Sequence, residues 1–322
     1  MKSINEIKSI AKATIELEGN SILKLIDYID DDFASVVDKV LRSKGRLIIT
    51  GIGKSANIAQ KLVSTFNSTG QPSIFMHAAD ALHGDLGNIQ ADDVVMCISK
   101  SGTTPEIKTL LPLLKNMRNP IIALTGNEDS YLSRHSTYTL LCKVEKEACP
   151  NNLAPTTSTT AQLVMGDALA VCLLECRNFS DQDFAKFHPG GSLGKRLLLK
   201  VEELCGESSK PVVGPCDSIK EVILEISNKR LGATLVVEDD ELLGIITDGD
   251  IRRMLESNLN WNSICAKDIM NSKPVIIEHN ELASTALTIM ERNKISQIIV
   301  RKESNYLGVV HIHDILKEGI EK

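Results

Sequence analysis

Aromatic side chains are scarce in this sequence, where they make up 3% of the 322 residues. Apolar residues nevertheless account for 43% of the chain, a share that excludes a mainly disordered protein. We therefore expect cores of Ile, Leu, Val and Ala, which suit a parallel sheet covered by helices. An excess of basic charge is lacking too, since 36 basic residues stand against 42 acidic ones. The formal net charge of −6 argues against nucleic acid as the main partner.

Paired cysteines and long uncharged apolar segments are also lacking. None of the eight cysteines forms a C-x-x-C pair or a zinc-finger spacing with histidine, so we expect free thiols in a reducing compartment. The N-terminal stretch carries charges throughout and has no signal-peptide core. No uncharged apolar run reaches the roughly 18 residues that span a membrane. These absences predict a cytoplasmic protein.

Short apolar runs alternate with helical patterns in the first part of the chain. Residues 4–43 have the apolar spacing of helices. Residues 156–174 predict a long apolar helix, and its apolar surface is wide enough for an oligomer interface. Five runs predict strands, at residues 46–50, 72–77, 93–99, 120–126 and 138–144. Strands that alternate with helices are typical of βαβ units. We therefore predict an α/β fold, a doubly wound parallel sheet with helices on both faces.

An internal repeat occupies the chain from residue 211 onward. Pro211 corresponds to Pro274 at an offset of 63 residues, and Gly244 corresponds to Gly308 at an offset of 64. Each copy reads as strand, helix, strand, strand, helix, which indicates two small α/β modules rather than a repeat array. We place the modules at residues 211–268 and 269–322. The polar segment GESSK (206–210) is the expected linker.

Three turns rich in hydroxyls or glycine precede predicted helices: GIGKS (51–55), SKSGTT (99–104) and PTTSTT (155–160). The first two follow predicted strands, and open α/β sheets bind ligands outside the carboxyl ends of their strands. Backbone N–H groups at a helix start, together with hydroxyls, can hold a phosphate dianion without a metal. These turns therefore predict a phosphate site.

The first two turns also have a simpler structural interpretation. GIGKS is an ordinary tight turn in that view, because a Walker A loop would need glycine where Ile48 stands and the dinucleotide pattern fails at Ala56. SKSGTT would be a solvated loop in which Thr103 and Glu106 form a helix capping box.

Five acidic or histidine side chains are candidates for acid–base chemistry: His77, His83, Glu106, Glu147 and His188. The first two histidines are six residues apart and do not share a helix face, so one structural and one ligand-facing histidine is more plausible than a metal pair. Most glutamates are surface residues. His188 lies in a turn rich in proline and glycine, where it is either a plain turn residue or an acid–base group.

Six segments together carry a resemblance: GIGKS, HGDLG, SKSGTTPEI, KEACP, PTTSTTAQLVMGDALA and HPGGSLGK. Residues 1–205 resemble a sugar isomerase (SIS) domain, and the repeat resembles a pair of CBS modules. Over nearly the whole chain the sequence is similar to the arabinose 5-phosphate isomerase family. The resemblance implies an aldose–ketose isomerase that interconverts D-ribulose 5-phosphate and D-arabinose 5-phosphate through an enediolate. That reaction is the first step of Kdo biosynthesis for lipopolysaccharide or capsule, and it requires no cofactor.

The resemblance also implies the site residues. Functional positions of the family fall on Lys54, His83, Glu106, Glu147 and His188. Phosphate-holding hydroxyls of SIS domains fall on Ser55, Ser99, Ser101 and Thr104. One position departs from the pattern, because Lys100 stands where relatives often carry Asn or Gln.

Isomerisation moves one proton between neighbouring carbons and needs a carboxylate base, a donor for the shifting oxygens and a cation. We expect Glu147 to be the C1–C2 base. His188 would open the furanose ring or move protons between oxygens. Lys54 would stabilise the charge of the phosphate or the enediolate. Glu106 would orient these groups or share the role of base.

Partners and alternatives follow from the same resemblance. SIS domains usually build their sites at subunit interfaces, which together with the apolar helix predicts a homotetramer. Thr247 and Asp250 resemble the ribose-contacting pair of nucleotide-binding CBS sites, whereas His311 replaces the hydroxyl in the second repeat. The effector would be a nucleotide or CMP-Kdo, unless the pair only braces the tetramer. His77 is the candidate ligand for an inhibitory zinc ion. The alternative functions are an isomerase of another sugar phosphate and a non-catalytic sugar-phosphate sensor.

Overall fold

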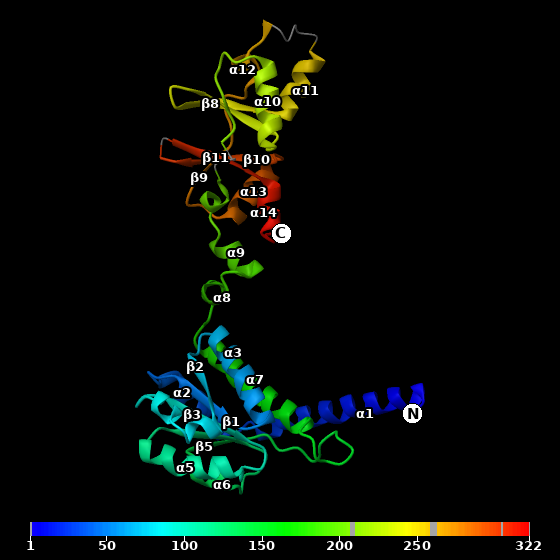
Figure 1. Ribbon diagram of the computed structural model, residues 1–322, viewed down its shortest axis with the longest axis vertical. Coiled ribbons are helices and arrows are strands. Elements are labelled where there is room, and N and C mark those ends of the chain that lie inside the picture. The colour runs from blue at the N-terminus through cyan, green and yellow to red at the C-terminus, as the bar shows by residue number, and fades with distance from the viewer. Residues whose placement is uncertain (1, 207–209, 258–262, 304, 322) are drawn as a thin grey trace. The chain divides into compact units, whose positions relative to one another are not determined.

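The computed structural model describes residues 2–206, 210–257, 263–303 and 305–321, and the chain divides into two units (Figure 1). The first unit spans Met1–Phe187 and the second spans His188–Lys322. Most of the predicted linker at residues 206–210 lies outside the described residues. All eight cysteines are free thiols, as their spacing predicts.

A five-stranded parallel sheet forms the centre of the first unit (Figure 1). Its strands are β1 (Leu47–Gly51), β2 (Ser73–His77), β3 (Val94–Ser99), β4 (Ile121–Thr125) and β5 (Tyr138–Leu141). Their spatial order is β2-β1-β3-β4-β5, and every neighbouring pair is parallel. Each strand overlaps one of the five predicted runs, so the doubly wound fold is confirmed. β1, β3 and β4 are buried along their whole length because helices cover both faces.

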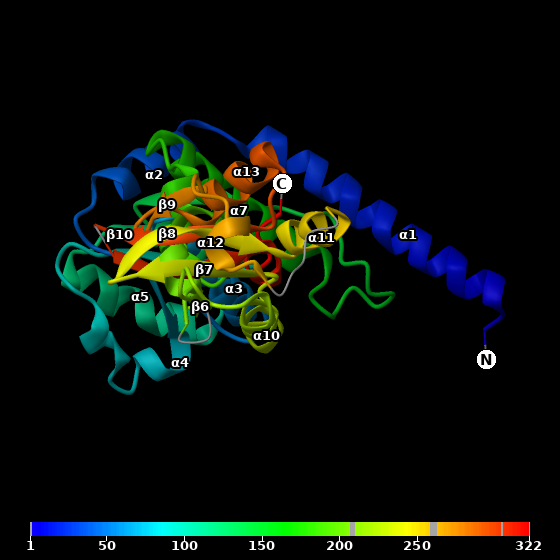
Figure 2. The same ribbon diagram turned by 90° about the horizontal axis from the view of Figure 1, so that it is seen from above.

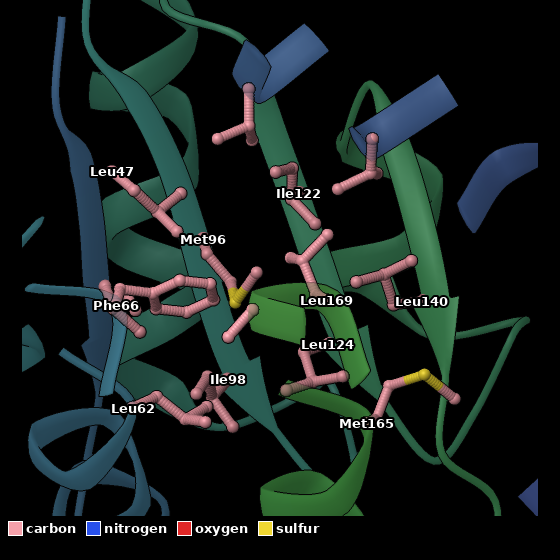
Figure 3. Close-up of a cluster of buried hydrophobic side chains, with 14 of the residues drawn as sticks. Leu47, Leu62, Phe66, Met96, Ile98, Ile122, Leu124, Leu140, Met165 and Leu169 are labelled. Atoms are coloured by element: carbon pink, nitrogen blue, oxygen red, sulfur yellow. The ribbon is translucent and has the colours of Figure 1, made fainter. Parts of the chain in front are cut away.

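Helices pack on both faces of this sheet. They are α2 (Asp31–Arg42), α3 (Lys54–Ser68), α4 (Ala78–Ala81), α5 (Pro105–Met117), α6 (Tyr131–His135), α7 (Thr157–Cys176) and α8 (Asp181–Phe187), with 3-10 turns η1 (Lys24–Tyr28) and η2 (Asp85–Asn88), whereas α1 (Ile4–Leu23) packs against α7. Alternate strand residues point to opposite faces, so Met96 packs with α2, α3 and α7, while Cys97 packs with α4, α5 and α6. Figure 3 shows the first of these cores, where Phe66 lies against the sheet.

Helices α1 and α7 carry apolar side chains beyond what the core of the first unit uses. By length and composition α7 could span a membrane, but nine of its residues are buried, and Met165 and Leu169 belong to the core beside Phe66 (Figure 3). Val171 of α7 is 56% exposed. Helix α1 has no buried residue and extends away from the rest of its unit (Figure 2). Both helices therefore present apolar side chains at the surface of the single chain.

The second unit contains the internal repeat. Its elements are α9 (Ser192–Leu198), η3 (Val201–Leu204), β6 (Val212–Val213), α10 (Ile219–Lys229), β7 (Ala233–Glu238), β8 (Glu241–Thr247), α11 (Asp248–Glu256), α12 (Ala266–Ile269), β9 (Ile276–Glu278), α13 (Ala283–Asn293), β10 (Gln297–Lys302), β11 (Asn305–His311) and α14 (Ile312–Lys317). The two sheets, ordered β6-β7-β8 and β11-β10-β9, confirm two modules with the predicted order of elements. Equivalent bulges follow Val236 and Val300, which are 64 residues apart.

The boundary between the units lies earlier than the sequence suggests. The resemblance places the first domain at residues 1–205, whereas the structure assigns residues 188–205 to the second unit. The reason is packing: Val201 is fully buried in the core of the second module, and its N–H donates to the Glu281 carbonyl at 2.9 Å. The Leu199 carbonyl accepts the N–H of Ala283 at 2.8 Å. Residues 188–205 therefore belong to the second unit by their contacts.

Candidate active site

The order of the strands reverses between β1 and β3, and doubly wound folds bind ligands at such a point. These two strands are direct neighbours, and Gly51 pairs with Ile98 at their carboxyl ends. The turn after β1 leads into α3, and the turn after β3 leads into α5. Two of the predicted phosphate-binding turns therefore lie side by side.

The turn after β3 is held by its own hydroxyl groups. The Ser99 hydroxyl lies 2.8 Å from that of Thr104 and accepts the N–H of Gly102 at 3.1 Å. Gly102 has a φ of +62°, and a Cβ at this position would lie 2.2 Å from the Ser130 hydroxyl oxygen. Both the backbone conformation and the space require glycine. The turn is therefore a rigid arrangement of hydroxyls rather than a loose solvated loop.

The alternative interpretation of this turn as a capping box is wrong. Thr104 is the N-cap of α5, and no side chain caps the helix there. The N–H and the hydroxyl of Thr103 instead donate to the Ser101 hydroxyl, at 3.3 and 3.2 Å. The Thr104 side chain thus does not cap α5, and uncapped backbone N–H groups at a helix start are suited to bind an anion.

The turn after β1 has the same character. Gly53 has a φ of +58° and forms the N-cap of α3 without a side-chain hydrogen bond. Lys54, the first residue of α3, is exposed. The Ser55 hydroxyl donates to Gln162 Oε1 on α7 at 3.2 Å, and Gln162 is 1% exposed. A buried amide therefore positions the serine hydroxyl.

A cavity of about 270 Å³ opens between these turns. It is lined by Ile52, Lys54, Ser55, Ile98, Ser99, Lys100, Ser101, Thr104, Pro155, Ser158 and Thr159. The structure thus brings together Lys54 and the four predicted phosphate-holding hydroxyls. The third hydroxyl-rich turn, at residues 155–160, completes the wall. Hydroxyls, ammonium groups and the starts of α3, α5 and α7 suit a phosphate dianion.

Glu147 lies behind this wall and is only 3% exposed. Its Oε1 accepts hydrogen bonds from the Lys100 ammonium at 2.5 Å and from the Ser158 hydroxyl at 2.6 Å. Its Oε2 accepts the N–H groups of Thr156 and Ser158 at 2.9 and 3.1 Å. Two of these partners, Lys100 and Ser158, also line the cavity. The carboxylate is therefore connected to the cavity through its own hydrogen-bond donors.

This environment keeps Glu147 ionised. Burial by itself would raise the pKa of the carboxyl group, but the hydrogen bonds from Lys100, Ser158 and Thr156 outweigh that effect and lower the pKa from 4.5 to about 2. The Glu147 side chain is consequently an anion at neutral pH, and its basicity is low while all its donors are in place.

The other acidic and histidine candidates of the first unit do not line the cavity. Glu106 lies in the first turn of α5, where its Oε2 is buried and has no hydrogen-bond partner among the described residues. His83 is exposed after α4. His77 Nδ1 is buried, 3.8 Å from Asp80 Oδ2. In the part of the chain that the structure describes, no three His, Cys, Asp or Glu side chains converge as metal ligands.

His188 is the first residue of the second unit. Its carbonyl accepts the N–H of Gly191 at 3.1 Å, and a Cβ at Gly194 would lie 2.0 Å from the same oxygen. The glycines therefore allow α9 to pack back on this turn and fix its backbone. The structure places His188 in this tight turn, as the sequence predicts, and not among the residues that line the cavity.

The two repeats differ at the equivalent polar positions. The N–H and the hydroxyl of Thr247 donate to Asp250 Oδ2 at 2.8 and 2.6 Å, forming a capping box at the start of α11. In the second repeat His311 caps α14, and its Nδ1 accepts the N–H of His313 at 3.1 Å. The two modules are thus not equivalent at this position, as the sequence predicts.

Two residues of the site make contacts that the sequence does not reveal. In the sequence Lys100 is notable only as a departure from a family pattern, although in the structure it lines the cavity and contacts Glu147. Gln162 lies inside an apolar helix, and nothing in its spacing indicates the bond to Ser55. The signal that could have found Ser158 is the third hydroxyl-rich turn before a helix.

The fold and this cavity define a phosphosugar-binding protein of the SIS class with a pair of CBS modules. The SIS domain family matches residues 40–172, and the CBS domain family matches residues 204–257 and 266–321. The chain belongs to the arabinose 5-phosphate isomerase family. It is 47% identical over 312 residues to the arabinose 5-phosphate isomerase KdsD of Francisella tularensis, covering 95% of both chains.

Further relatives agree with this assignment. The chain is 40% identical over 317 residues to the KdsD protein of Escherichia coli K12, covering 98% of this chain and 97% of that one. A solved structure of an Escherichia coli CFT073 protein in complex with arabinose 5-phosphate is 38% identical, with a TM-score of 0.57. The similarity covers 58% of this chain and all of that chain.

Proposed function

We propose that the protein is an aldose–ketose isomerase that interconverts D-ribulose 5-phosphate and D-arabinose 5-phosphate, the first step toward Kdo. One observation carries the proposal: a buried, ionised glutamate, Glu147, is hydrogen-bonded to two residues of a cationic, hydroxyl-lined cavity. The names of the relatives, and the arabinose 5-phosphate bound to the structural neighbour, support this substrate over other sugar phosphates.

The phosphate of the substrate would occupy the turn after β3. Ser99, Ser101 and Thr104 offer hydroxyls there, and Ser55 faces them from the start of α3. The helix starts add N–H groups and the positive ends of their dipoles. A phosphate held at this point directs the carbon chain of the sugar along the cavity wall, where Lys54 and Ser158 lie.

Proton transfer would then take place between C1 and C2. Glu147 takes the proton from one carbon and returns it to the other, which gives the ketose or the aldose. Lys54 stabilises the negative charge that develops on the enediolate oxygens. His188 provides the acid–base function that opens the furanose ring or moves the hydroxyl proton between O1 and O2. Glu106, whose buried Oε2 has no hydrogen-bond partner among the residues that the structure describes, orients these groups or shares the role of base.

The reaction should need no added metal, because the cavity is lined by hydroxyls and ammonium groups rather than by metal ligands. We expect the purified chain to interconvert the two pentose phosphates in the presence of EDTA, with little turnover in a panel of other sugar phosphates. Loss of activity on chelation, restored by a divalent ion, would contradict the cofactor-free mechanism. If none of the sugar phosphates in the panel is turned over, a non-catalytic sensor is favoured instead.

Added zinc is expected to inhibit the enzyme if it captures His77, His83 or His188.

We further propose that the protein is a cytoplasmic homotetramer whose CBS pair binds a nucleotide effector such as CMP-Kdo. The exposed apolar side chains of α1 and α7 support assembly, since Ile4 and Ile15 are each 72% exposed in the single chain. The Thr247–Asp250 pair of the first repeat supports a nucleotide site, because a hydroxyl and a carboxylate are suited to bind ribose.

Both parts of this proposal can be tested on the full-length chain. Sedimentation at micromolar concentration should give the mass of four chains, and an active monomer would contradict the assembly. An effector that binds two states of the enzyme with different affinity shifts the population of those states. Adding it should therefore change the activity. Asp250→Ala should remove that response, whereas Asp314→Ala at the matched position of the second repeat should retain it. A response that survives in both variants would place the effector site elsewhere.

A further inference from the structure

Lys100 joins the two halves of the candidate site. Its backbone follows Ser99 in the hydroxyl-rich turn, and its side chain lines the same cavity as Ser101 and Thr104. Its ammonium donates to Glu147 Oε1, and the side chain is 45% exposed. Among the donors to Glu147 in the described part of the chain, Lys100 is the charged one. It therefore has access both to an incoming phosphate and to the proposed base.

We propose that Lys100 couples phosphate binding to the release of Glu147. In the free enzyme the ammonium holds the carboxylate. When a phosphate dianion enters the cavity, the ammonium turns toward the phosphate, and Oε1 of Glu147 loses its charged donor, which allows it to accept the proton from carbon. The ammonium keeps its own proton throughout, and the substrate proton moves from carbon to the carboxylate and back. This proposal rests on the proposed isomerase function.

The competition between the two anions gives the direction of the change. A phosphate dianion has twice the charge of a carboxylate, and its oxygens are good acceptors of charge-assisted hydrogen bonds. The lysine side chain is a flexible four-carbon stem with three rotatable N–H donors, so it can change partner without movement of the backbone. Glu147 would retain the Ser158 hydroxyl and the N–H groups of Thr156 and Ser158, which keep it in place.

The change of partner of Lys100 also explains how Glu147 can act as a base although its pKa is lowered in the free chain. A general base works best when its pKa lies near the working pH, and the hydrogen bonds in the free chain lower the pKa of Glu147 instead. Loss of the charged donor raises the basicity of the carboxylate only when phosphate is present. Lys100 would therefore be a positioning residue that makes the base depend on the phosphate group of the substrate.

The test separates the phosphate from the sugar. Unphosphorylated D-ribulose is supplied as the substrate, and inorganic phosphate is added as a separate molecule. In the wild-type enzyme we expect phosphate to accelerate isomerisation of ribulose by about tenfold or more, since binding energy from a non-reacting part can activate the reacting part. Lys100→Gln retains a neutral N–H donor for Glu147 but loses the charge, and it should show no acceleration. Lys100→Arg should retain part of it.

The control variant is Lys115→Met, which removes an exposed lysine from the other end of α5 and should behave as wild type. Thermal unfolding of each variant shows whether the fold is intact. If Lys100→Gln is accelerated by phosphate as strongly as Lys115→Met, or if phosphate does not accelerate the wild-type enzyme, the proposal is overturned. A purely structural role of Lys100 would lower all rates but would leave the acceleration factor unchanged.

Failure of the isomerase assignment can be told apart from failure of this proposal. If wild-type enzyme does not turn over D-ribulose 5-phosphate, the proposed function is wrong. Calorimetric binding of inorganic phosphate then still tests the contact to Lys100. Lys100→Gln should weaken that binding by about ten- to hundredfold, the range expected for loss of a charged hydrogen bond. An unchanged affinity would exclude the contact.

Discussion

Replacing Glu147 with glutamine is expected to lower kcat for D-ribulose 5-phosphate by about 10²–10⁴-fold, the usual contribution of a positioned general base. The amide has nearly the shape of the carboxylate but cannot accept the substrate proton. Because the phosphate-holding hydroxyls are unaltered, KM should change much less than kcat. Steady-state kinetics with both pentose phosphates would measure the effect in each direction.

Glu106→Gln is the matched control for this variant, since Glu106 is a second glutamate near the cavity that accepts none of the same hydrogen bonds. We expect a smaller loss from it. If Glu147→Gln stays near wild-type activity and Glu106→Gln does not, the two roles are exchanged.

The wild-type protein has a pH dependence of stability that the Glu147→Gln variant lacks. The folded-state pKa of Glu147, about 2, lies below the ordinary value of 4.5. The carboxylate therefore stabilises the fold above pH 4.5, and this contribution disappears as the pH falls toward 2. The difference in unfolding temperature between wild type and variant should accordingly shrink over this range. A kinetic loss with an unchanged fold at neutral pH would assign the effect to chemistry.

Replacing Lys54 with methionine is expected to lower kcat/KM by about ten- to hundredfold, because a charged hydrogen bond to the substrate is lost. Lys54 is exposed at the start of α3 and lines the cavity, so its removal should cost little stability. If the ammonium binds the phosphate, KM rises. If it stabilises the enediolate, kcat falls while KM is unchanged. The kinetics thus distinguish the two roles proposed for this lysine.

Lys61→Met provides the control on the same helix. Lys61 forms a partly exposed ion pair with Asp167, and such pairs contribute at most about 1 kcal/mol. This variant should therefore have wild-type kinetics. Equal losses in the Lys54 and Lys61 variants would indicate a general effect on α3 rather than a contact to the substrate.

The sheet was predictable because its signal is local. Strands β1, β3 and β4 are continuous apolar runs between polar turns. Such runs are typical of parallel strands that are buried on both faces of the sheet. The repeat was predictable because two copies of one pattern confirm each other. The predicted hydroxyls meet at one cavity because parallel strands end at the same edge of the sheet.

The remaining features depend on contacts between distant residues. The bond from Lys100 to Glu147 joins positions 47 residues apart, and the bond from Ser55 to Gln162 joins positions 107 apart. The end of the first unit is set by the packing of Val201 against the second module, and no composition change marks it. The pattern T-x-x-E at Thr103–Glu106 fits a capping box, yet the Ser101 hydroxyl accepts the Thr103 N–H that Glu106 would bind in such a box, and it also accepts the Thr103 hydroxyl.

The hydrogen bonds of Glu147 also have a consequence for local order. The carboxylate binds the N–H groups of Thr156 and Ser158, so one side chain ties together the two ends of a segment that contains neither helix nor strand from residue 147 to residue 156. Segments held by few contacts open at lower free energy than the sheet. Glu147, the group proposed to move the substrate proton, thus also holds this loop in place. Protonation of its carboxylate would weaken these hydrogen bonds and loosen the wall of the cavity. Acid should therefore open the site locally before it unfolds the domain.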